Sequence, residues 1–431
     1  MIHTSLSPNT ENDDLWIAFK QLVFPWNWFG WRKGPVTIGL EQSFQEYLGM
    51  KNAFSMQRGR DALYVLLQAM GIEKGDEVIL QAYTCIVVPN AIQYTGAKPV
   101  YVDIEKKGFN IDPDLIEAAI TPKTKVVIIQ HTFGNPAKIA EIQKICQENS
   151  LLLIEDCAHS LSAEVNGQKV GTFGHAAIWS FGRDKIISST WGGMITTDND
   201  LLAKKIEESY EQIPFPSFFQ VFQALMHPLI FAIIKPMYSS KIGKGLLVLS
   251  QKLKLIPRVI FRIEKMGQKP HFFPQQMSNA LAHLALNQLK KLGRFHQHRK
   301  KLAMRYGEEL KDMPYELPLN NPLASLKGEN SAHLRFPLRH PNAQSILQAA
   351  KQQGLYLGDW YTTVLAPADC QLKDFQYKPG SCPRAEQAAV ETLNLPTHIQ
   401  MTPAKVERVV EFLRQQIGGG YSSRLPPIKG E

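Results

Sequence analysis

Short apolar segments recur through the first half of the chain, and each ends in polar or small residues. They lie at residues 77–80, 99–103, 125–130, 151–154 and 176–181. Such segments are typical of strands buried on both faces of a parallel sheet. Helical patterns lie between them, for example Leu63, Leu66, Leu67 and Met70 on one helix face. Strands and helices at this spacing predict βαβ units, and hence an α/β fold with a mostly parallel central sheet and flanking helices.

The pattern changes between residues 213 and 270. Residues 213–234 contain no Lys, Arg, Asp or Glu and approach the length of a transmembrane helix. Pro216 and Pro228 interrupt them, and a crossing would place the two halves of one fold on opposite sides of a bilayer, so we do not interpret them as a span. The next residues predict a helix with one apolar face, kinked or divided at Pro257. Its apolar positions are Ile242, Leu246, Leu249, Leu253, Ile256, Ile260 and Ile263.

Basic residues concentrate in the same region. The net charge of +9 would ordinarily suggest a nucleic-acid partner. Within residues 213–270, however, Glu264 is the sole acidic residue beside nine basic ones, so the excess is local and we expect no nucleic acid. The basic residues are Lys235, Lys241, Lys244, Lys252, Lys254, Arg258, Arg262, Lys265 and Lys269.

Two interpretations of residues 213–270 stay open. An uncharged, Phe-rich segment beside a basic amphipathic helix is typical of interfacial helices, which predicts reversible contact with an anionic membrane. Alternatively, the apolar face packs on the protein, as in most soluble amphipathic helices.

The N-terminal segment 15–34 is rich in aromatic residues. It carries Trp16, Phe19, Phe24, Trp26, Trp28, Phe29 and Trp31, with Lys20, Arg32 and Lys33 among them. These rings either pack on the main domain or form an interfacial anchor, because Trp and basic residues favour the membrane–water boundary.

Length, cysteines and the N-terminus narrow the class of protein. A chain of 431 residues exceeds one ordinary core and predicts a large and a smaller domain. The five cysteines form no CxxC pair, which favours a reducing compartment and argues against a metal site. Residues 1–14 lack the basic and apolar regions of a secretory signal. We expect a cytoplasmic protein, peripheral at the inner face of the membrane if residues 213–270 bind lipid.

Asp156 and Lys185 are the strongest chemical signal. Asp156 ends the apolar run 151–154, which places a carboxylate at the carboxyl end of a strand, where open α/β sheets bind ligands. Lys185 follows the next apolar run. A buried carboxylate and an amine on neighbouring strand ends suit pyridoxal 5′-phosphate (PLP), whose pyridine nitrogen pairs with the carboxylate while the amine binds covalently.

From about Val36 to Ile417 the chain resembles the DegT/DnrJ/EryC1/StrS aminotransferases. The resemblance rests on IEDCAHS at 154–160, VGTFG at 170–174, SF at 180–181, Lys185 and the glycine pair 192–193. It implies a PLP enzyme of fold type I with a smaller C-terminal α+β domain. The implied parts are an aromatic arm (1–35), a PLP-binding domain (36–293) with an insertion at 213–270, a small domain (294–417) and a flexible tail (418–431).

The resemblance also implies roles for individual residues. Lys185 binds PLP and moves protons, while Asp156 pairs with the pyridine nitrogen. Ser180 and the helix N-terminus at Gly59 and Arg60 hold the phosphate.

Two further cofactor-binding positions and several departures follow from the same resemblance. His159 contacts the phenolic oxygen of PLP, and Cys85 stands where the family places a stacked aromatic ring. Either Tyr83 replaces that ring or the cofactor is held less tightly. Asp61 fits a phosphate site only if it turns away or caps the helix, and Gln276 replaces a residue that reaches the phosphate across a dimer interface.

We therefore predict a PLP-dependent aminotransferase that works as a homodimer. It would transfer an amino group, from glutamate by family habit, to a nucleotide- or lipid-linked keto-sugar in cell-surface polysaccharide or secondary-metabolite biosynthesis. The alternative is a degenerate, non-catalytic regulator or scaffold at the membrane, which the changes at Arg58, Asp61, Cys85 and Gln276 favour.

Overall fold

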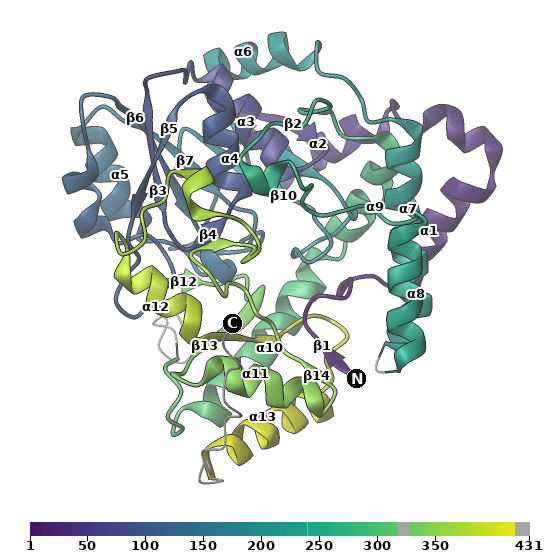
Figure 1. Cartoon of the computed structure of the whole chain (residues 1–431). Helices are drawn as coiled ribbons and strands as arrows, with labels where there is room; N and C mark the ends of the chain where they lie inside the picture. Colours follow the sequence, from purple (N-terminus) through teal and green to yellow (C-terminus); the bar gives the residue numbers. More distant parts are fainter. Residues whose placement is uncertain (239, 318–327, 419–431) are drawn as a thin grey trace, which may run out of the picture.

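The computed structural model describes residues 1–238, 240–317 and 328–418 (Figure 1). The central sheet has seven strands in the order β2–β11–β10–β7–β6–β3–β5, and within it only β11 runs antiparallel to its neighbours. The strands are β2 (Asn52–Met56), β3 (Glu77–Gln81), β5 (Lys98–Val102), β6 (Thr124–Gln130), β7 (Leu152–Asp156), β10 (Ala176–Ser180) and β11 (Gly193–Thr197). The predicted α/β fold with a mostly parallel sheet is confirmed.

Helices cover both faces of this sheet because successive strand residues point to opposite sides. In β6, Val127 and Ile129 belong to the same buried core as residues of α2, α5 and α9, while Val126 and Ile128 belong to the core on the other face, with residues of α3, α4 and α6. The helices are α2 (Val36–Leu48), α3 (Gly59–Ala69), α4 (Val87–Thr95), α5 (Ile139–Glu148), α6 (Asp200–Tyr210) and α9 (Asn279–Leu289).

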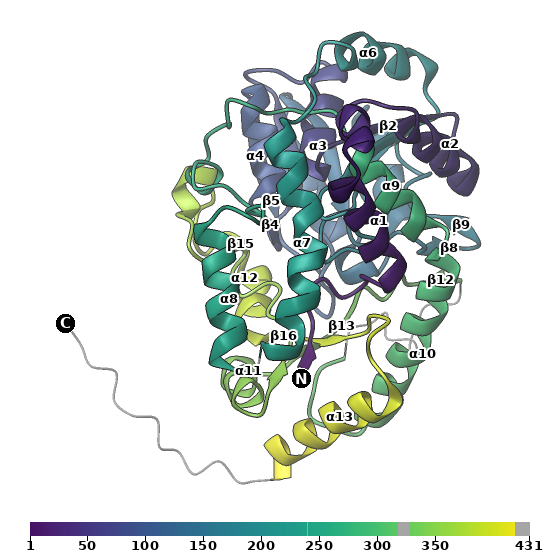
Figure 2. The ribbon, with the colours of Figure 1, turned by 90° about the vertical axis from the view of Figure 1, so that its right-hand side faces the viewer.

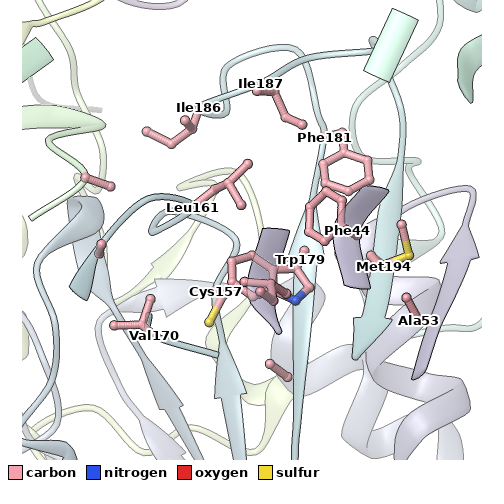
Figure 3. Close-up of a cluster of buried hydrophobic side chains, with 14 of the residues drawn as sticks. Phe44, Ala53, Cys157, Leu161, Val170, Trp179, Phe181, Ile186, Ile187 and Met194 are labelled. Atoms are coloured by element: carbon pink, nitrogen blue, oxygen red, sulfur yellow. The ribbon is translucent and has the colours of Figure 1, made fainter. Parts of the chain in front are cut away.

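A cluster of aromatic rings fixes the strand that leads to the candidate site. Trp179 of β10 meets Phe44 edge-on at 5.7 Å between ring centroids (Figure 3). Its indole N–H donates to Thr196 Oγ1. Gly171 has a φ of +87°, and a Cβ there would lie 2.2 Å from the indole ring. Only glycine fits this approach. This packing fixes the position of β10, and with it the start of the loop that leads to Lys185.

The C-terminal part forms a second, smaller core. It contains α10 (Leu292–Leu310), α11 (Ala343–Gln352), α13 (Pro403–Gly418) and the antiparallel pair of β13 (Arg335–Arg339) with β16 (Thr392–Pro396). At its edge, β1 (Ile2–His3) pairs with β14 (Leu355–Tyr356). Nearer the large domain, β15 (Leu365–Ala366) pairs with β4 (Thr84–Cys85), and α12 (Pro383–Glu391) lies beside them. The predicted domain limits stay predictions, and the tail 419–431 lies outside the described residues.

The segment 213–270 folds into two helices along one side of the molecule. These are α7 (Phe218–Met237) and α8 (Lys241–Lys252), and α7 packs against α8, α9 and α1 (Asn12–Val23) (Figure 2). Among the described residues, α7 alone is long and apolar enough to cross a membrane, and 44% of its most apolar window is buried in the protein. The packing of α7 agrees with our decision not to interpret it as a span.

The predicted helix over 242–263 was wrong in its second half. The structure ends α8 at Lys252, before Pro257. Lys254 has a φ of +55°, its N–H donates to Gln251 O, and the Leu255 N–H donates to Ser250 O. This pair of hydrogen bonds is a Schellman motif, which terminates a helix. Glycine usually occupies the left-handed position of this motif. Because a lysine occupies it here, the sequence carries no signal that the helix ends at Lys252.

Candidate active site

A cavity of about 560 Å³ opens at the carboxyl ends of β7 and β10. The parallel strands bring their ends to one edge, so residues distant in sequence meet there. Six of the seven predicted site residues line this cavity, and His159 does not. The six are Gly59, Arg60, Cys85, Asp156, Ser180 and Lys185.

Lys185 and Asp156 are electrostatically coupled inside this cavity. Burial lowers the pKa of Lys185 to about 8, although the charge of Asp156 acts in the opposite direction. Burial raises the pKa of Asp156. Two interactions oppose this rise: the Ala158 N–H donates to Asp156 Oδ1 at 3.0 Å, and the charge of Lys185 favours the ionised carboxylate. An amine with a pKa near 8 is partly neutral at physiological pH, which suits both a nucleophile and a base.

His159 lies behind the cavity wall. Its ring stacks on Trp360, with 5.4 Å between centroids, and its Nδ1 accepts from the Phe133 N–H at 3.3 Å. Burial, with the charges of Lys185 and Arg335, lowers the pKa of His159 well below its usual value. The imidazole is therefore neutral and supports Trp360. The predicted contact between His159 and the cofactor stays a prediction.

The N-terminus of α3 forms the opposite end of the cavity. No side chain caps this helix, so its first amides remain available as donors. A Cβ on Gly59 would lie 3.1 Å from Ser180 Cβ, and one on Gly193 would lie 2.6 Å from the backbone of Arg58 and Gly59. Arg58 Nε and Nη2 are buried and have no hydrogen-bond partner among the residues that the structure describes. Uncapped amides and unpaired guanidinium donors together make a site for an anion.

Comparison with known proteins identifies the chain. The model of the DegT/DnrJ/EryC1/StrS aminotransferase family matches residues 23–213 and 264–414. The chain belongs to this family. The match confirms the family and the activity class, that of an aminotransferase, and it leaves residues 214–263 uncovered.

Three relatives illustrate the similarity. The dTDP-4-dehydro-2,3,6-trideoxy-D-glucose 4-aminotransferase of Saccharopolyspora spinosa is 29% identical over 94% of both chains. The spore coat polysaccharide biosynthesis protein SpsC of Bacillus subtilis is 29% identical over 90% of this chain and 92% of its own. The structure of NtdA from Bacillus subtilis with bound cofactor PMP has a TM-score of 0.72 at 23% identity, covering 97% of this chain and 85% of that one.

In this family member, the charged residues at the start of α3 that differ from the family pattern form ion pairs within the protein. Asp61 does not line the cavity, because its carboxylate turns to Arg58, with Oδ2 at 3.5 Å from Nη1. Arg60 Nε forms an ion pair with Glu264 Oε1 at 2.9 Å, and the two terminal nitrogens of Arg60 donate to Val259 O. The predicted condition for Asp61, that it turn away, is met. The contact to Val259 also joins the phosphate end to the segment that follows α8.

The aromatic wall of the cavity comes from unexpected places. Tyr83 is fully buried and does not line the cavity, because its hydroxyl accepts from the Tyr361 N–H at 2.8 Å. Cys85 does line it, with Trp360 and Trp191. Of the two alternatives for this position, the structure does not place the Tyr83 ring in the cavity. Tryptophans from two other segments supply aromatic surface beside the small Cys85 side chain.

The two glutamines before Met277 are used within this subunit. Gln275 Oε1 accepts from Arg58 at 3.3 Å, and Gln276 Nε2 donates to the carbonyl groups of Tyr210 and Ile213. Gln276 is therefore held inside its own chain, which accounts for its departure from the family pattern.

Sequence reasoning missed Asp184 and Arg335. Asp184 lines the cavity, and burial raises its pKa to about 6, while Arg335 acts in the opposite direction. The Arg335 guanidinium lies 3.6 Å from the centre of the Trp360 ring. Asp184 is the neighbour of Lys185 in sequence, but Arg335 comes from the small domain, and no local pattern connects them.

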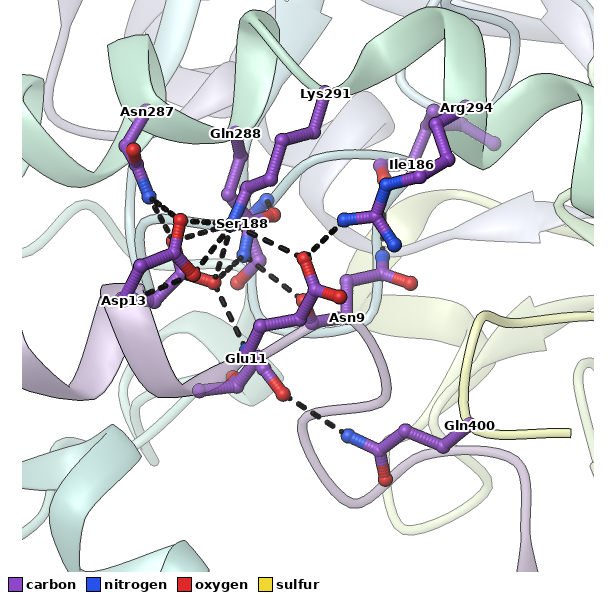
Figure 4. A network of polar contacts seen from close by, with 12 residues as sticks. Asn9, Glu11, Asp13, Ile186, Ser188, Asn287, Gln288, Lys291, Arg294 and Gln400 are labelled. Atoms are coloured by element: carbon purple, nitrogen blue, oxygen red, sulfur yellow. Dashed lines mark hydrogen bonds and ion pairs between the residues drawn. The ribbon is translucent and has the colours of Figure 1, made fainter.

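Asn9 is a third residue that sequence reasoning missed, and it contacts the loop that carries Lys185. Its amide Nδ2 donates to Lys185 O at 2.5 Å and to Ile186 O at 3.0 Å. Its Oδ1 accepts from Arg299 Nη2 at 2.7 Å. Around it, Glu11 at the N-cap of α1 pairs with Arg294, and Asp13 in the first turn pairs with Lys291 (Figure 4). The N-terminal arm therefore positions the backbone of Lys185.

His131, Glu155 and Cys157 form a compact buried group whose ligand atoms lie within 4.8 Å of one another. The Glu155 carboxylate accepts from the N–H groups of Gly171, Phe173 and Gly174 and contacts His131 Nε2 at 3.2 Å. His131 Nδ1 accepts from the Ala137 N–H. These bonds engage the carboxylate and imidazole, so the group organises the VGTFG loop. His131 therefore has a local structural role.

Proposed function

We propose that the chain is a PLP-dependent aminotransferase that aminates a keto-sugar, with Lys185 and Asp156 as its catalytic residues. The observation that carries this proposal is their arrangement in one cavity, where a buried amine with a pKa near 8 is coupled to a buried carboxylate. The uncapped N-terminus of α3 closes the other end of the cavity.

The residues of the cavity suit the phosphate, the pyridine nitrogen and the aldehyde of PLP. The unpaired nitrogens of Arg58, Ser180 and the amides that begin α3 suit the phosphate. The approach of Gly193 to Gly59 leaves no room for a side chain there. Asp156 suits the pyridine nitrogen, and Lys185 suits the carbonyl carbon.

Each residue then has a defined task. PLP, when bound, withdraws electrons from the amino acid and makes its α-proton acidic. Asp156 keeps the pyridine nitrogen protonated, because a carboxylate in a low-dielectric site stabilises the adjacent cation. Lys185 can accept and return the α-proton, and Trp360, held by Arg335 and His159, limits water beside it.

The acceptor is the carbonyl group of a sugar. Relatives similar over nearly the whole chain are named for a dTDP-linked sugar aminotransferase and for polysaccharide biosynthesis, which supports this class of substrate. We propose glutamate as donor and a nucleotide- or lipid-linked keto-sugar as acceptor.

The test is a two-step titration of the protein reconstituted with PLP. Glutamate should bleach the absorbance of the bound cofactor, and the correct member of a panel of nucleotide- and lipid-linked keto-sugars should restore it. Absence of cofactor absorbance after reconstitution would instead favour the non-catalytic regulator or scaffold.

The rate of PLP uptake should rise with pH around 8. Lys185 is protonated below its folded pKa and neutral above it, and only the neutral amine attacks the aldehyde. Stopped-flow absorbance with the apoprotein measures the midpoint, which should shift to lower pH in Asp156→Asn because Asp156 raises the pKa of Lys185. A midpoint above pH 10 would contradict the burial of this amine.

Lys185 should also make the apoprotein more stable as pH rises from about 8 to 10.5. In this window the unfolded chain binds a proton that the folded chain has released, so folding is favoured at higher pH. Urea unfolding of the apoprotein and of Lys185→Met, compared across the window, isolates the contribution of Lys185.

We propose a homodimer, because fold type I enzymes complete their active sites across a two-fold interface. Light scattering should give twice the mass of the chain. Full activity at a monomeric mass would contradict the proposal.

We also propose a cytoplasmic location, with a peripheral contact between residues 213–270 and the inner face of an anionic membrane. The basic, acid-poor composition of this segment supports the contact.

A further inference from the structure

An exposed aromatic patch covers one end of the face formed by α1 and α7. The arm contributes Trp16 and Phe19 from α1, and Trp26, Trp28 and Phe29 from the 3-10 helix η1 (Pro25–Gly30). Phe29 is 92% exposed and Trp26 68%. Burying these rings would remove a large apolar area from water, so a cluster of this kind marks an interaction surface.

The patch is continuous across two segments that lie far apart in the sequence. Phe218 and Phe219, at the start of α7, are half exposed beside η1. The Trp31 ring lies 6.3 Å from that of Phe218, and the Arg32 guanidinium lies 5.6 Å from the Phe218 ring. Between η1 and α7 runs an apolar groove of about 710 Å³. Folding therefore brings the aromatic arm onto the segment already proposed to contact a membrane.

The two segments that build this face are basic. Residues 15–34 and 214–263 contain ten Lys or Arg and no Asp or Glu, against a net charge of +9 for the whole chain. On α8, Lys244 and Lys252 are exposed beside the exposed apolar side chains of Val248 and Leu249. The helices α1, α7 and α8 lie on the side that faces the viewer in Figure 2 and along the right-hand edge of Figure 1.

We propose that this face, made of α1, η1, α7 and α8, docks on an anionic lipid bilayer, with the aromatic rings in the interface and the basic side chains among the headgroups. The inference rests on the proposed membrane contact of residues 213–270 and adds the N-terminal arm as its anchor. Indole and phenyl rings beside Lys and Arg match the chemistry of that boundary.

Charge decides between a bilayer and a second copy of the chain. In a two-fold dimer the same patch meets itself, so exposed basic side chains such as Lys244 and Lys252 would face like charges, and these segments contain no acidic residue to pair with them. The acidic side chains at the N-cap and in the first turn of α1 pair with Arg294 and Lys291 instead. A surface of opposite charge is the complementary occupant.

The test is sedimentation with vesicles of phosphatidylcholine alone or mixed with phosphatidylglycerol. Binding should require phosphatidylglycerol and weaken as salt rises, because the Debye length shortens. The double variant Trp26→Gln/Phe29→Gln should lose about tenfold in partition coefficient for each ring. Lys244→Gln/Lys252→Gln should lose about fivefold for each charge. Both pairs are exposed, so these variants should fold.

Matched controls lie on other helices. Val390→Gln on α12 and Lys144→Gln on α5 remove an exposed apolar and an exposed basic side chain and should bind vesicles like the wild type. Glutamate bleaching of the bound cofactor should be unchanged in every variant, so a failure of the proposed aminotransferase activity is seen separately.

Two outcomes would overturn the inference. The first is that, at low salt, the same amount of wild-type protein stays in the supernatant with both vesicle types. The second is that Trp26→Gln/Phe29→Gln has a smaller mass than the wild type in light scattering but binds vesicles equally well. That result would assign the patch to a subunit interface.

Discussion

Lys185→Ala should abolish transamination while leaving the fold intact. The side-chain amine is the group in the cavity suited both to bind PLP and to move the α-proton, and losing both tasks should lower kcat/KM by about four orders of magnitude or more. The variant replaces a buried amine whose protonated form the fold disfavours, so its stability should not fall sharply.

Two measurements check this prediction independently of turnover. Far-UV circular dichroism should match the wild type, and cofactor colour should wash out after borohydride treatment and dialysis. Added methylamine should restore part of the activity, because a small amine can replace the missing proton carrier. Cofactor that survives dialysis of the reduced variant would show that another lysine binds PLP.

Asp156→Asn should retain PLP but lower turnover by about two to four orders of magnitude. Asparagine keeps the shape and the acceptor oxygen, yet a neutral amide no longer stabilises a protonated pyridine nitrogen. Steady-state kinetics should therefore show a fall in kcat with a smaller change in the amount of cofactor bound.

The structure sharpens the control for this variant. Glu155 is the neighbouring carboxylate, but its oxygens accept from three backbone N–H groups and it does not line the cavity. Glu155→Gln should therefore reduce stability, measured by urea unfolding, more than it changes the spectrum of bound PLP. Turnover of Asp156→Asn within a few-fold of wild type would assign the pyridine partner to another group.

Local motifs predicted much of the site because a strand and the loop after it place their residues without help from elsewhere. Asp156 and Ser180 end two adjacent parallel strands, and Gly59 begins the helix that faces them. Trp360 and Arg335 come from the small domain and reach Lys185 through tertiary packing. No periodicity or spacing in the sequence records that contact.

The errors have similar physical causes. The apolar positions from Ile242 to Ile263 keep a helical period, but the backbone hydrogen bonds at Lys254 end the helix before the last of these positions. Tyr83 is a candidate for the stacked ring on sequence grounds because it lies two residues before Cys85. The Tyr361 N–H holds its hydroxyl elsewhere, a bond across 278 residues.

The bonds of Asn9 restrict how the two domains can move. One amide side chain links the Lys185 loop of the large domain to Arg299 of the small one, and β1, a few residues earlier, is already paired with β14. A hinge rotation that opened the cavity by swinging the small domain away would have to break this tether or drag the Lys185 loop with it. Substrate entry by opening a loop at the mouth therefore requires less rearrangement than entry by domain opening. Trapping the domains with a cross-link should leave the bleaching rate with glutamate almost unchanged.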